Sequence, residues 1–399
     1  MSTTTLAGAT NAPRSEYDPY TDAALLDPWP GYRHLRDLGP AVWLPRYEMF
    51  ALTRHASVTR ALRDWETFSS ASGVMMNDDM NQVLRGNTLC SDGADHDALR
   101  RVVIKPLRPR ELATITEDIT REAERVVDRV VALGSFDATA DLAHHLPLAI
   151  VSNLIGLPEE GRERMLVWAS EMFNCFGPRN ERTVSAFRVL EEMVGYASTQ
   201  AVRGKLKPGG WAEALHDAAD RGEVPREAVP VMMIDYMGPS LDTTIFAITS
   251  AVALFAEHPD QWDLVRADPK LIPGAMNEVL RLEAPIQDFS RLAVADYDMD
   301  GVLIPAGSRS IVFYGAAGRD EREYPDPDRF DVHRNPTNHL AFGTGPHVCL
   351  GVFLARLEMT ALFTALARKV RRFELGESKR ALHNILRGYE RLDITVTVA

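Results

Sequence analysis

A single cysteine near the end of the chain lies in a segment rich in glycine. Cys349 is the only thiol in the run Phe342-Gly343-Thr344-Gly345-Pro346-His347-Val348-Cys349-Leu350-Gly351. Glycine permits backbone conformations that other residues avoid, and proline fixes its own φ, so this composition predicts a tight loop. The two other cysteines, Cys90 and Cys175, show no paired spacing that would indicate a disulfide or a Cys-rich metal site. Cys349 is therefore either an ordinary buried thiol or one strong ligand to a metal whose remaining ligands are not protein side chains.

The ten-residue run favours the second interpretation, because it fits the pattern Phe-x-x-Gly-x-x-x-Cys-x-Gly. This is the haem-thiolate loop of cytochromes P450, and the chain resembles a bacterial member of that family. The resemblance implies haem b as cofactor and Cys349 as the ligand to its iron. It implies that Phe342 and Gly343 belong to the cofactor-binding loop, and that Gly351 lets the following helix start close to the ring. A thiolate ligand favours cleavage of the O–O bond of dioxygen.

A second chemical signal is the pair Asp242-Thr243 in the run Gly238-Pro239-Ser240-Leu241-Asp242-Thr243-Thr244. In the resembled family an acid and a Thr at these positions help to deliver protons to dioxygen, which is general acid catalysis. Pro239 has no N–H and predicts a local break in the helix. Pro239 and Ser240 depart from the family's usual pair of small residues, which leaves the efficiency of coupling open. The alternative is an ordinary helix in which Thr243 bonds to its own backbone.

Four cations stand where the family binds the two carboxylates of haem. His96 and Arg100 are four residues apart and share one helix face, Arg291 follows a helix, and His347 precedes Cys349 by two residues. Each residue alone would be an ordinary surface charge. The resemblance implies that together they bind the propionates.

A Glu-x-x-Arg pair, Glu278 and Arg281, stands about seventy residues before Cys349, with Arg334 between them and the cysteine. Spacing i, i+3 places both side chains on one helix face, where such a pair is usually solvated. In the resembled family these three residues form a buried network beneath the haem. We therefore assign Glu278, Arg281 and Arg334 a structural role.

The pattern of apolar residues predicts a mainly α fold with a minor β region, consistent with a single cytochrome P450 domain over residues 15–399. Residues 1–14 are rich in Ser, Thr and Ala, and we expect them to be disordered. Between 315 and 346, Asp, Pro, Arg and Gly predict a long irregular segment that serves a site. The expected helices are 116–132, 141–155, 182–203, 228–257, 259–267, 272–281 and 351–370, and the expected strands are 41–44, 49–52, 291–293, 310–314 and 392–398.

Composition excludes some classes of function. The net charge of −12 argues against a nucleic-acid-binding protein, which would carry a basic excess. Three unpaired cysteines and the absence of a visible signal peptide or membrane anchor lead us to expect a soluble cytoplasmic protein. The most apolar stretch, 229–256, contains Asp235 and Asp242, so we expect a buried helix rather than a membrane span.

Electrons must come from another protein, because the sequence carries no flavin or iron–sulfur motif. A basic cluster within 96–111 stands out in the acidic chain and predicts a docking face for a ferredoxin or a similar acidic protein. An ordinary solvated face is the alternative. The cluster consists of Arg100, Arg101, Lys105, Arg108 and Arg110.

The substrate interpretation rests on resemblance to a bacterial subfamily that acts on para-substituted aromatic acids, chiefly by oxidative O-demethylation. The segments that carry it are 173–180, 240–244 and 386–390. Members of that subfamily that bind aromatic acids have an Arg-Ser pair where this chain has Ile234-Asp235. Ile cannot pair a carboxylate and Asp repels one, so we expect a neutral methoxyaromatic resembling an alkyl-guaiacol. The expected pocket residues are Phe173, Phe176, Ile234, Met237, Phe289, Leu386 and Met75, with Arg85 as a possible anion anchor; core packing is the alternative for each aromatic residue.

Three functions remain open at this point. The first is a monooxygenase that uses O2 and releases formaldehyde from a methoxyaromatic, or that hydroxylates or demethylates a para-substituted benzoate. The second is a haem-thiolate binding or sensor protein without turnover. The third uses peroxide directly. Asp242 and Thr243 argue against the last two, since neither needs a pair of residues that delivers protons.

Overall fold

The computed structural model describes residues 11–399. The segment expected to be disordered, 1–14, lies mostly outside the described residues. Its described part is held against strand β1 (Val42–Leu44), where the Trp43 amide donates to the Pro13 carbonyl at 2.8 Å. The Asn11 side chain also donates to the Gly301 carbonyl at 2.8 Å. The expectation is therefore wrong for 11–14, because backbone pairing with a distant strand leaves no trace in local composition.

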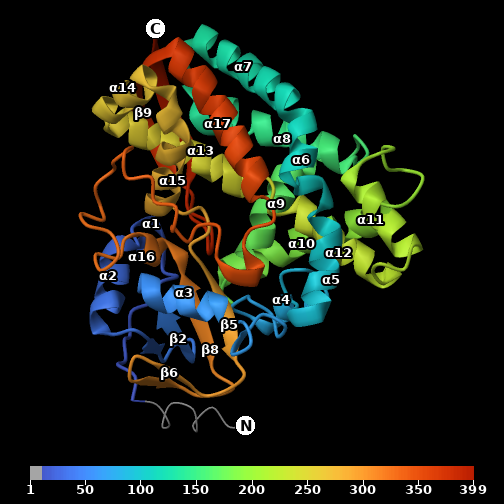
Figure 1. Cartoon of the computed structure of the whole chain (residues 1–399), viewed down its shortest axis with the longest axis vertical. Helices are drawn as coiled ribbons and strands as arrows, with labels where there is room; N and C mark the ends of the chain where they lie inside the picture. Colours follow the sequence, from blue (N-terminus) through green and yellow to red (C-terminus); the bar gives the residue numbers. More distant parts are fainter. Residues whose placement is uncertain (1–10) are drawn as a thin grey trace.

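Helices dominate the molecule: 53% of the chain is helical and 14% is strand, in a single domain, which confirms the expected fold class. In Figure 1 most of the long helices gather in the upper half, around α13 and α17. The helices are α1 (Asp22–Leu26), α2 (Trp29–Leu38), α3 (His55–Arg63), α4 (Asp78–Val83), α5 (Gly93–Val103), α6 (Pro109–Leu112), α7 (Thr116–Leu133), α8 (His145–Ile155), α9 (Met165–Asn174), α10 (Glu181–Thr199), α11 (Trp211–Asp220), α12 (Val229–Met237), α13 (Asp242–Glu257), α14 (Pro259–Ala267), α15 (Ile272–Leu282), α16 (Tyr314–Gly318) and α17 (Val352–Lys369).

The strands form one larger sheet and two small ones. The five-stranded sheet has the order β1-β2-β8-β5-β3, with β2 and β8 parallel and the other pairs antiparallel, and it lies in the lower half of Figure 1. A three-stranded sheet has the order β4-β10-β9, and β6 pairs with β7. The remaining strands are β2 (Met49–Leu52), β3 (Phe68–Ser69), β4 (Ser135–Asp137), β5 (Asp288–Ala293), β6 (Tyr297–Met299), β7 (Val302–Ile304), β8 (Arg309–Phe313), β9 (Val370–Arg380) and β10 (Tyr389–Val398).

Strand β9 is the longest strand that the sequence did not predict. Only Val370 and Phe373 in it are buried, and the rest of the strand is mostly exposed, so no alternation of apolar residues reveals it. Pairing along β10 holds it instead. The strand β10 shows the expected alternation, since Leu392, Ile394 and Val396 are buried.

The long apolar segment expected as one helix over 228–257 is two helices, α12 and α13, separated by a turn. Pro239 lies in that turn, and its missing N–H interrupts the ladder of backbone hydrogen bonds. The stretch Arg226–Glu257 is long and apolar enough to cross a membrane, but 72% of its apolar window is buried inside the fold. That burial is typical of a core helix, as the sequence predicted.

Glu278, Arg281 and Arg334 meet in a buried network, as expected. The Glu278 carboxylate accepts hydrogen bonds from Arg281 Nε at 2.7 Å and Nη2 at 2.8 Å, and from Arg334 Nε at 3.0 Å. Arg281 Nη1 also donates to the carbonyls of Gly318 and Pro327, both at 2.7 Å. The network thereby ties α15 to the irregular segment that leads into the Cys349 loop.

Candidate active site

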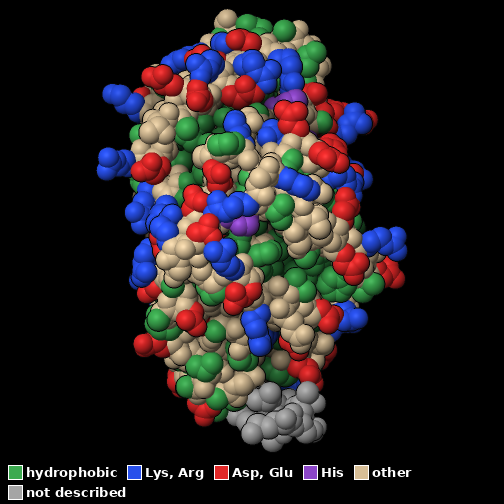
Figure 2. All heavy atoms as spheres, turned by 90° about the vertical axis from the view of Figure 1, so that its right-hand side faces the viewer, with side chains coloured by type: hydrophobic (Ala, Val, Ile, Leu, Met, Phe, Trp, Pro, Cys, Tyr) green, Lys and Arg blue, Asp and Glu red, His purple; other side chains and the backbone are tan. Residues whose placement is uncertain are grey.

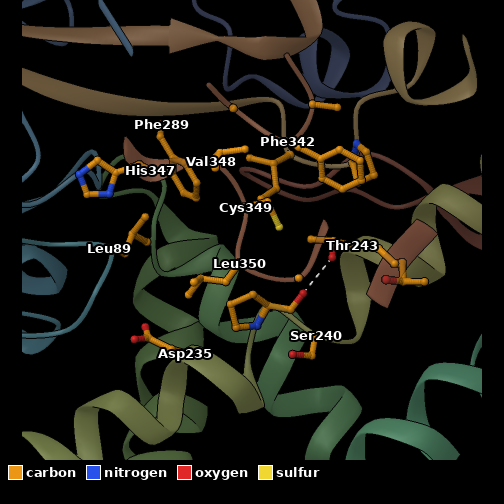
Figure 3. Close-up of a pocket in the computed structure, with 18 of the residues that line it drawn as sticks. Leu89, Asp235, Ser240, Thr243, Phe289, Phe342, His347, Val348, Cys349 and Leu350 are labelled. Atoms are coloured by element: carbon orange, nitrogen blue, oxygen red, sulfur yellow. Dashed lines mark hydrogen bonds between the residues drawn. The ribbon is translucent and has the colours of Figure 1, made fainter. Parts of the chain in front are cut away.

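The Cys349 loop is fixed by its own backbone. The Cys349 amide donates to the Phe342 carbonyl at 2.8 Å, which closes the loop. Gly345 has φ +75°, and a Cβ there would lie 2.7 Å from the Leu62 carbonyl oxygen, so this position requires glycine. Figure 3 shows the Cys349 sulfur projecting from the loop into a cavity that Phe342 and Val348 also line.

Two opposing effects act on the Cys349 thiol. Burial raises its pKa, because it disfavours the charged thiolate. The amides of Gly351 and Val352 and the Arg100 guanidinium lower the pKa, since they stabilise negative charge on sulfur. The loop therefore presents hydrogen-bond donors and a cation to a sulfur that faces the cavity, which suits a thiolate ligand to a bound metal.

Cationic and polar groups from three parts of the chain converge on the same cavity. Arg100, Arg291 and His347 line it, and Arg291 is only 3% exposed. Arg100 donates to the Val348 carbonyl at 2.6 Å. The His96 ring lies 4.3 Å from the ring of His347, and the buried His96 Nε2 has no hydrogen-bond partner among the described residues. Arg100, Arg291 and His347 thus line the cavity, as predicted for anion binding, whereas His96 contacts the His347 ring but does not itself line the cavity.

Besides the His96 ring, His347 contacts Asp92, which the sequence did not indicate. Its Nε2 lies 3.1 Å from Asp92 Oδ1, and the Asp92 carboxylate also accepts from the Ser69 hydroxyl at 2.7 Å. The His347 side chain, together with other donors, lowers the pKa of Asp92 against the effect of burial. Asp92 therefore fixes the orientation of the His347 ring at the edge of the cavity.

The break between α12 and α13 forms part of the opposite wall. Pro239, Ser240 and Thr243 line the cavity, and Thr243 Oγ1 donates to the Pro239 carbonyl at 2.8 Å, the dashed line in Figure 3. The back-bonded Thr243 considered from the sequence is therefore present. It does not exclude a role in catalysis, because a hydroxyl that donates to a carbonyl still has lone pairs to accept another hydrogen bond.

Asp242 does not line the cavity. Its carboxyl group is buried against α9, within hydrogen-bond reach of Ser170 and near Glu171. Burial raises the pKa of Asp242 to about 7, and the nearby Glu171 carboxylate adds to the effect while Ser170 opposes it. A carboxyl group with a pKa near neutrality is suited to transfer protons at physiological pH.

Aromatic and aliphatic side chains form the remaining wall. Phe173, Phe176, Ile234 and Phe289 line the cavity, as predicted. The rings of Phe173 and Phe176 meet edge to face at 5.3 Å, and those of Phe176 and Phe289 lie 6.2 Å apart. Such a wall matches the flat shape of an aromatic ring.

Four predicted pocket residues do not line the cavity. Met237 and Leu386 are buried in the core, and Ile286, which pairs with Leu386 through a β-bridge, reaches the cavity instead. Met75 is 1% exposed and packs against the Cys90 sulfur at 4.0 Å. The Arg85 side chain is exposed. Each of these four residue types is common in substrate pockets, but the tertiary packing of this fold keeps their side chains out of the cavity wall.

Several lining residues were not assigned from the sequence. Ser240, Thr244 and Ala247 line the cavity beside the predicted Thr243, and the four residues are spaced i, i+3, i+4 and i+7, a periodicity that could have identified this helix face. Asp235 also lines the cavity, although the sequence indicated only that it would disfavour an anionic substrate. Nothing local to the sequence indicates the contributions of Leu84, Asn87, Thr88, Leu89, Tyr314 and Glu358.

Comparison with known proteins identifies the family. The family model for cytochrome P450 matches residues 212–390. Cytochrome P450 CYP199A2 of Rhodopseudomonas palustris is 36% identical, over 97% of this chain and 95% of its own length. Cytochrome P450 130 of Mycobacterium tuberculosis is 30% identical, over 88% of this chain and 90% of its own length. The crystal structure of P450BioI in complex with an acyl carrier protein superposes with a TM-score of 0.85 at 26% identity, and the match covers 94% of this chain and 99% of that one.

Haem b is the cofactor that this family implies, and the cavity fits it. Cys349 can ligate its iron, while Arg100, Arg291 and the unpartnered His96 nitrogen can bind its two propionates. Shared sequence over nearly the whole length, the shared fold and the cysteine loop agree, and the chain belongs to the cytochrome P450 family as a haem-thiolate monooxygenase.

Proposed function

We propose that this monooxygenase removes the methyl group of a neutral, para-substituted methoxyaromatic compound such as a 4-alkyl-2-methoxyphenol. The methyl ether, O2, two electrons and two protons give the phenol, formaldehyde and water. One oxygen atom enters the methyl C–H bond, and the resulting hemiacetal breaks at its C–O bond to release formaldehyde. Haem bound through Cys349 supplies the oxidising chemistry, and the protein orients the ring, excludes water and delivers protons.

The aromatic wall supports a ring-shaped substrate. Phe173 and Phe176 at the end of α9 meet Phe289 of the distant strand β5 in the cavity wall. Edge-to-face packing against their rings would orient an aromatic substrate with a specificity that aliphatic side chains alone do not give.

The observation that carries the choice of a neutral substrate is the carboxyl group of Asp235 in the cavity wall. Bringing a benzoate into the cavity would place a second carboxyl group near a buried acid, which is unfavourable for both. Arg85, the one cation that the sequence offered as an anchor, is exposed and does not line the cavity. The charge of this wall therefore favours a neutral methoxyaromatic over a para-substituted benzoate.

Thr243 and Asp242 are proposed to deliver the protons that the reaction consumes. The Thr243 hydroxyl is at the cavity wall, held by the Pro239 carbonyl, and Asp242 is adjacent in the chain with a pKa raised to about 7. A turnover-free haem sensor would need neither group, so these residues favour an enzyme that activates O2.

Electrons are proposed to arrive from an acidic ferredoxin or a similar protein in the cytoplasm. Arg101 on α5, Arg108 between the two helices and Arg110 on α6 are all exposed. Lys105 pairs with Glu223 at 2.7 Å. Figure 2 shows Lys and Arg interspersed with Asp and Glu over the face that it draws, so steering would come from a few local cations. Such cations increase the rate of encounter with an acidic partner most at low salt.

Turnover of two matched compounds tests the proposal. The holoenzyme is supplied with NADH, a ferredoxin and its reductase, and formaldehyde is measured against NADH consumed. We expect one formaldehyde for each productive turnover of 2-methoxy-4-propylphenol, and little from 4-methoxybenzoate. Tighter binding and faster demethylation of the benzoate would overturn the choice of a neutral substrate, and NADH consumption without formaldehyde from either compound would overturn the reaction.

A further inference from the structure

The cavity is lined by two acids that come from opposite sides. Glu358 belongs to α17, the helix that follows the Cys349 loop, whereas Asp235 belongs to α12. In Figure 3 Asp235 and Ser240 lie on the helical side of the cavity, below the loop that carries Cys349. Asp235 therefore lies on the side of the cavity that the break between α12 and α13 forms.

Asn87 and Thr88 supply the donors that hold the Asp235 carboxylate. Asn87 Nδ2 donates to Oδ1 at 3.1 Å, and the Thr88 amide donates to Oδ2 at 3.3 Å. The Cys90 amide donates to the side-chain oxygen Oδ1 of Asn87 at 2.9 Å, which fixes the orientation of the Asn87 side chain. A carboxylate can accept about four hydrogen bonds, and the Asp235 carboxylate accepts two, so it retains capacity for a further donor.

Asp235 has no counterion among the described residues: no Lys, Arg or His forms an ion pair with it, and no cation contributes to its pKa shift. Burial raises its pKa to about 6, against the effect of the Asn87 and Thr88 donors. Burial therefore desolvates the carboxyl group. A ligand that donates a hydrogen bond to it would relieve part of the cost of that desolvation.

We infer that Asp235 is a specificity-determining residue that accepts a hydrogen bond from a phenolic hydroxyl group of the substrate. The inference deepens the proposed function, on which its choice of substrate class rests. The hydrogen bond to Asp235 would favour binding of methoxyphenols, which carry a hydroxyl group, over aromatic ethers and acids of the same shape.

A phenol suits this position better than an ammonium group. A primary ammonium has three N–H donors and a phenol has one. The side chains around Asp235 in the wall include Leu84, Leu89 and Ile234, which accept no hydrogen bonds. An ammonium would leave donors unsatisfied in the cavity, whereas a phenol places its single donor on Asp235 and its ring against apolar side chains.

Spectral titration of the holoenzyme tests the inference without requiring turnover. The probes are 2-methoxy-4-propylphenol, its methyl ether 1,2-dimethoxy-4-propylbenzene and 4-methoxybenzylamine. The variant is Asp235→Asn, which retains the shape of the side chain and removes its charge. Asp288→Asn is the matched control, because Asp288 is also a buried acid with a raised pKa but hydrogen-bonds to Tyr20 at 2.8 Å and does not line the cavity.

We expect the wild type to bind the phenol at least about tenfold more tightly than the methyl ether, as is usual for a hydrogen bond to a charged group. Asp235→Asn should reduce that ratio to about threefold or less, and Asp288→Asn should keep it. An unchanged ratio in Asp235→Asn, or tighter binding of the amine than of the phenol by the wild type, would overturn the inference. The wild-type ratio is informative even if the variant fails to fold.

Formaldehyde assays separate this inference from the proposed function. If neither methoxy compound releases formaldehyde while phenol binding still depends on Asp235, the proposed reaction fails and the binding role stands. If both compounds are demethylated and bound with equal affinity, the reaction stands and the role of Asp235 fails.

Discussion

The buried Glu278 carboxylate should contribute much more to stability than a partly exposed carboxylate with the same local spacing to an exposed arginine. Glu278 is 0% exposed and is shared by Arg281 and Arg334. The substitution Glu278→Gln keeps the size of the side chain and removes its charge. It leaves the Arg281 guanidinium, which is 1% exposed, without a countercharge at the centre of the network.

The magnitude follows from that burial. Removing one partner of a buried ion pair costs about 3–5 kcal/mol, because an uncompensated charge remains in the interior. A chain of 399 residues has an unfolding entropy of about 0.84 kcal/mol/K, at ~2.1 cal/mol/K for each residue. The melting temperature should therefore fall by about 4–6 °C if the domain unfolds cooperatively.

The matched control is Glu122→Gln on the surface of α7. Glu122 and Arg125 have the same i, i+3 order as Glu278 and Arg281, but the Arg125 side chain is 58% exposed. Such a pair contributes about 0.5 kcal/mol or less, so the control should melt within about 1 °C of the wild type. Melting is followed by circular dichroism, and the carbon monoxide difference spectrum reports whether the Cys349 loop still binds haem. A loss of stability in Glu278→Gln no larger than that of the control would refute the reasoning.

The residues proposed to act in catalysis and Cys349 give four further predictions. Thr243→Val removes the hydroxyl that donates to Pro239, and the formaldehyde formed for each NADH consumed should fall about tenfold or more, whereas an unchanged ratio would contradict its role. Asp242→Asn should slow turnover and remove its pH dependence; in the wild type, turnover should decline as pH rises above about 7, because only the protonated carboxyl group can donate. Because burial raises the pKa of Asp242, the wild type should lose stability relative to Asp242→Asn as pH rises from about 4 to about 7. Melting temperatures that change in parallel with pH for the two proteins would contradict this raised pKa. Cys349→Ala should abolish the wavelength shift of the carbon monoxide difference spectrum that a thiolate ligand causes, and retention of that shift would exclude Cys349 as the ligand.

The sequence identified most of the chemistry because these functional groups lie in short local patterns. The loop around Cys349, the pair Asp242-Thr243 and the pair Glu278-Arg281 each occupy a few consecutive residues, and local spacing fixes their relative positions. The same locality predicted the helices α7, α14 and α17, which carry regular apolar faces, and the break at Pro239, which follows from a missing N–H.

Pocket geometry was predicted less completely, because it depends on contacts between distant segments. Phe173, Phe176 and Phe289 were assigned correctly to the cavity, but Met75, Met237, Leu386 and Arg85 were not. Whether a side chain reaches the cavity depends on the helices and strands that pack around it. Those neighbours are distant in the chain, so no local pattern indicates them.

By itself, the sequence determined the family, the sulfur that can ligate the haem iron, and the acid and alcohol beside the helix break. Only the tertiary structure placed Asn87 and Thr88 on Asp235, 147 or more residues along the chain, and made Asp235 a lining residue of the cavity with no ion-pair partner among residues 11–399. The physical reason is that the cost of a buried charge, and the ligand that can relieve it, depend on every group within a few ångströms in space rather than on neighbours in the chain.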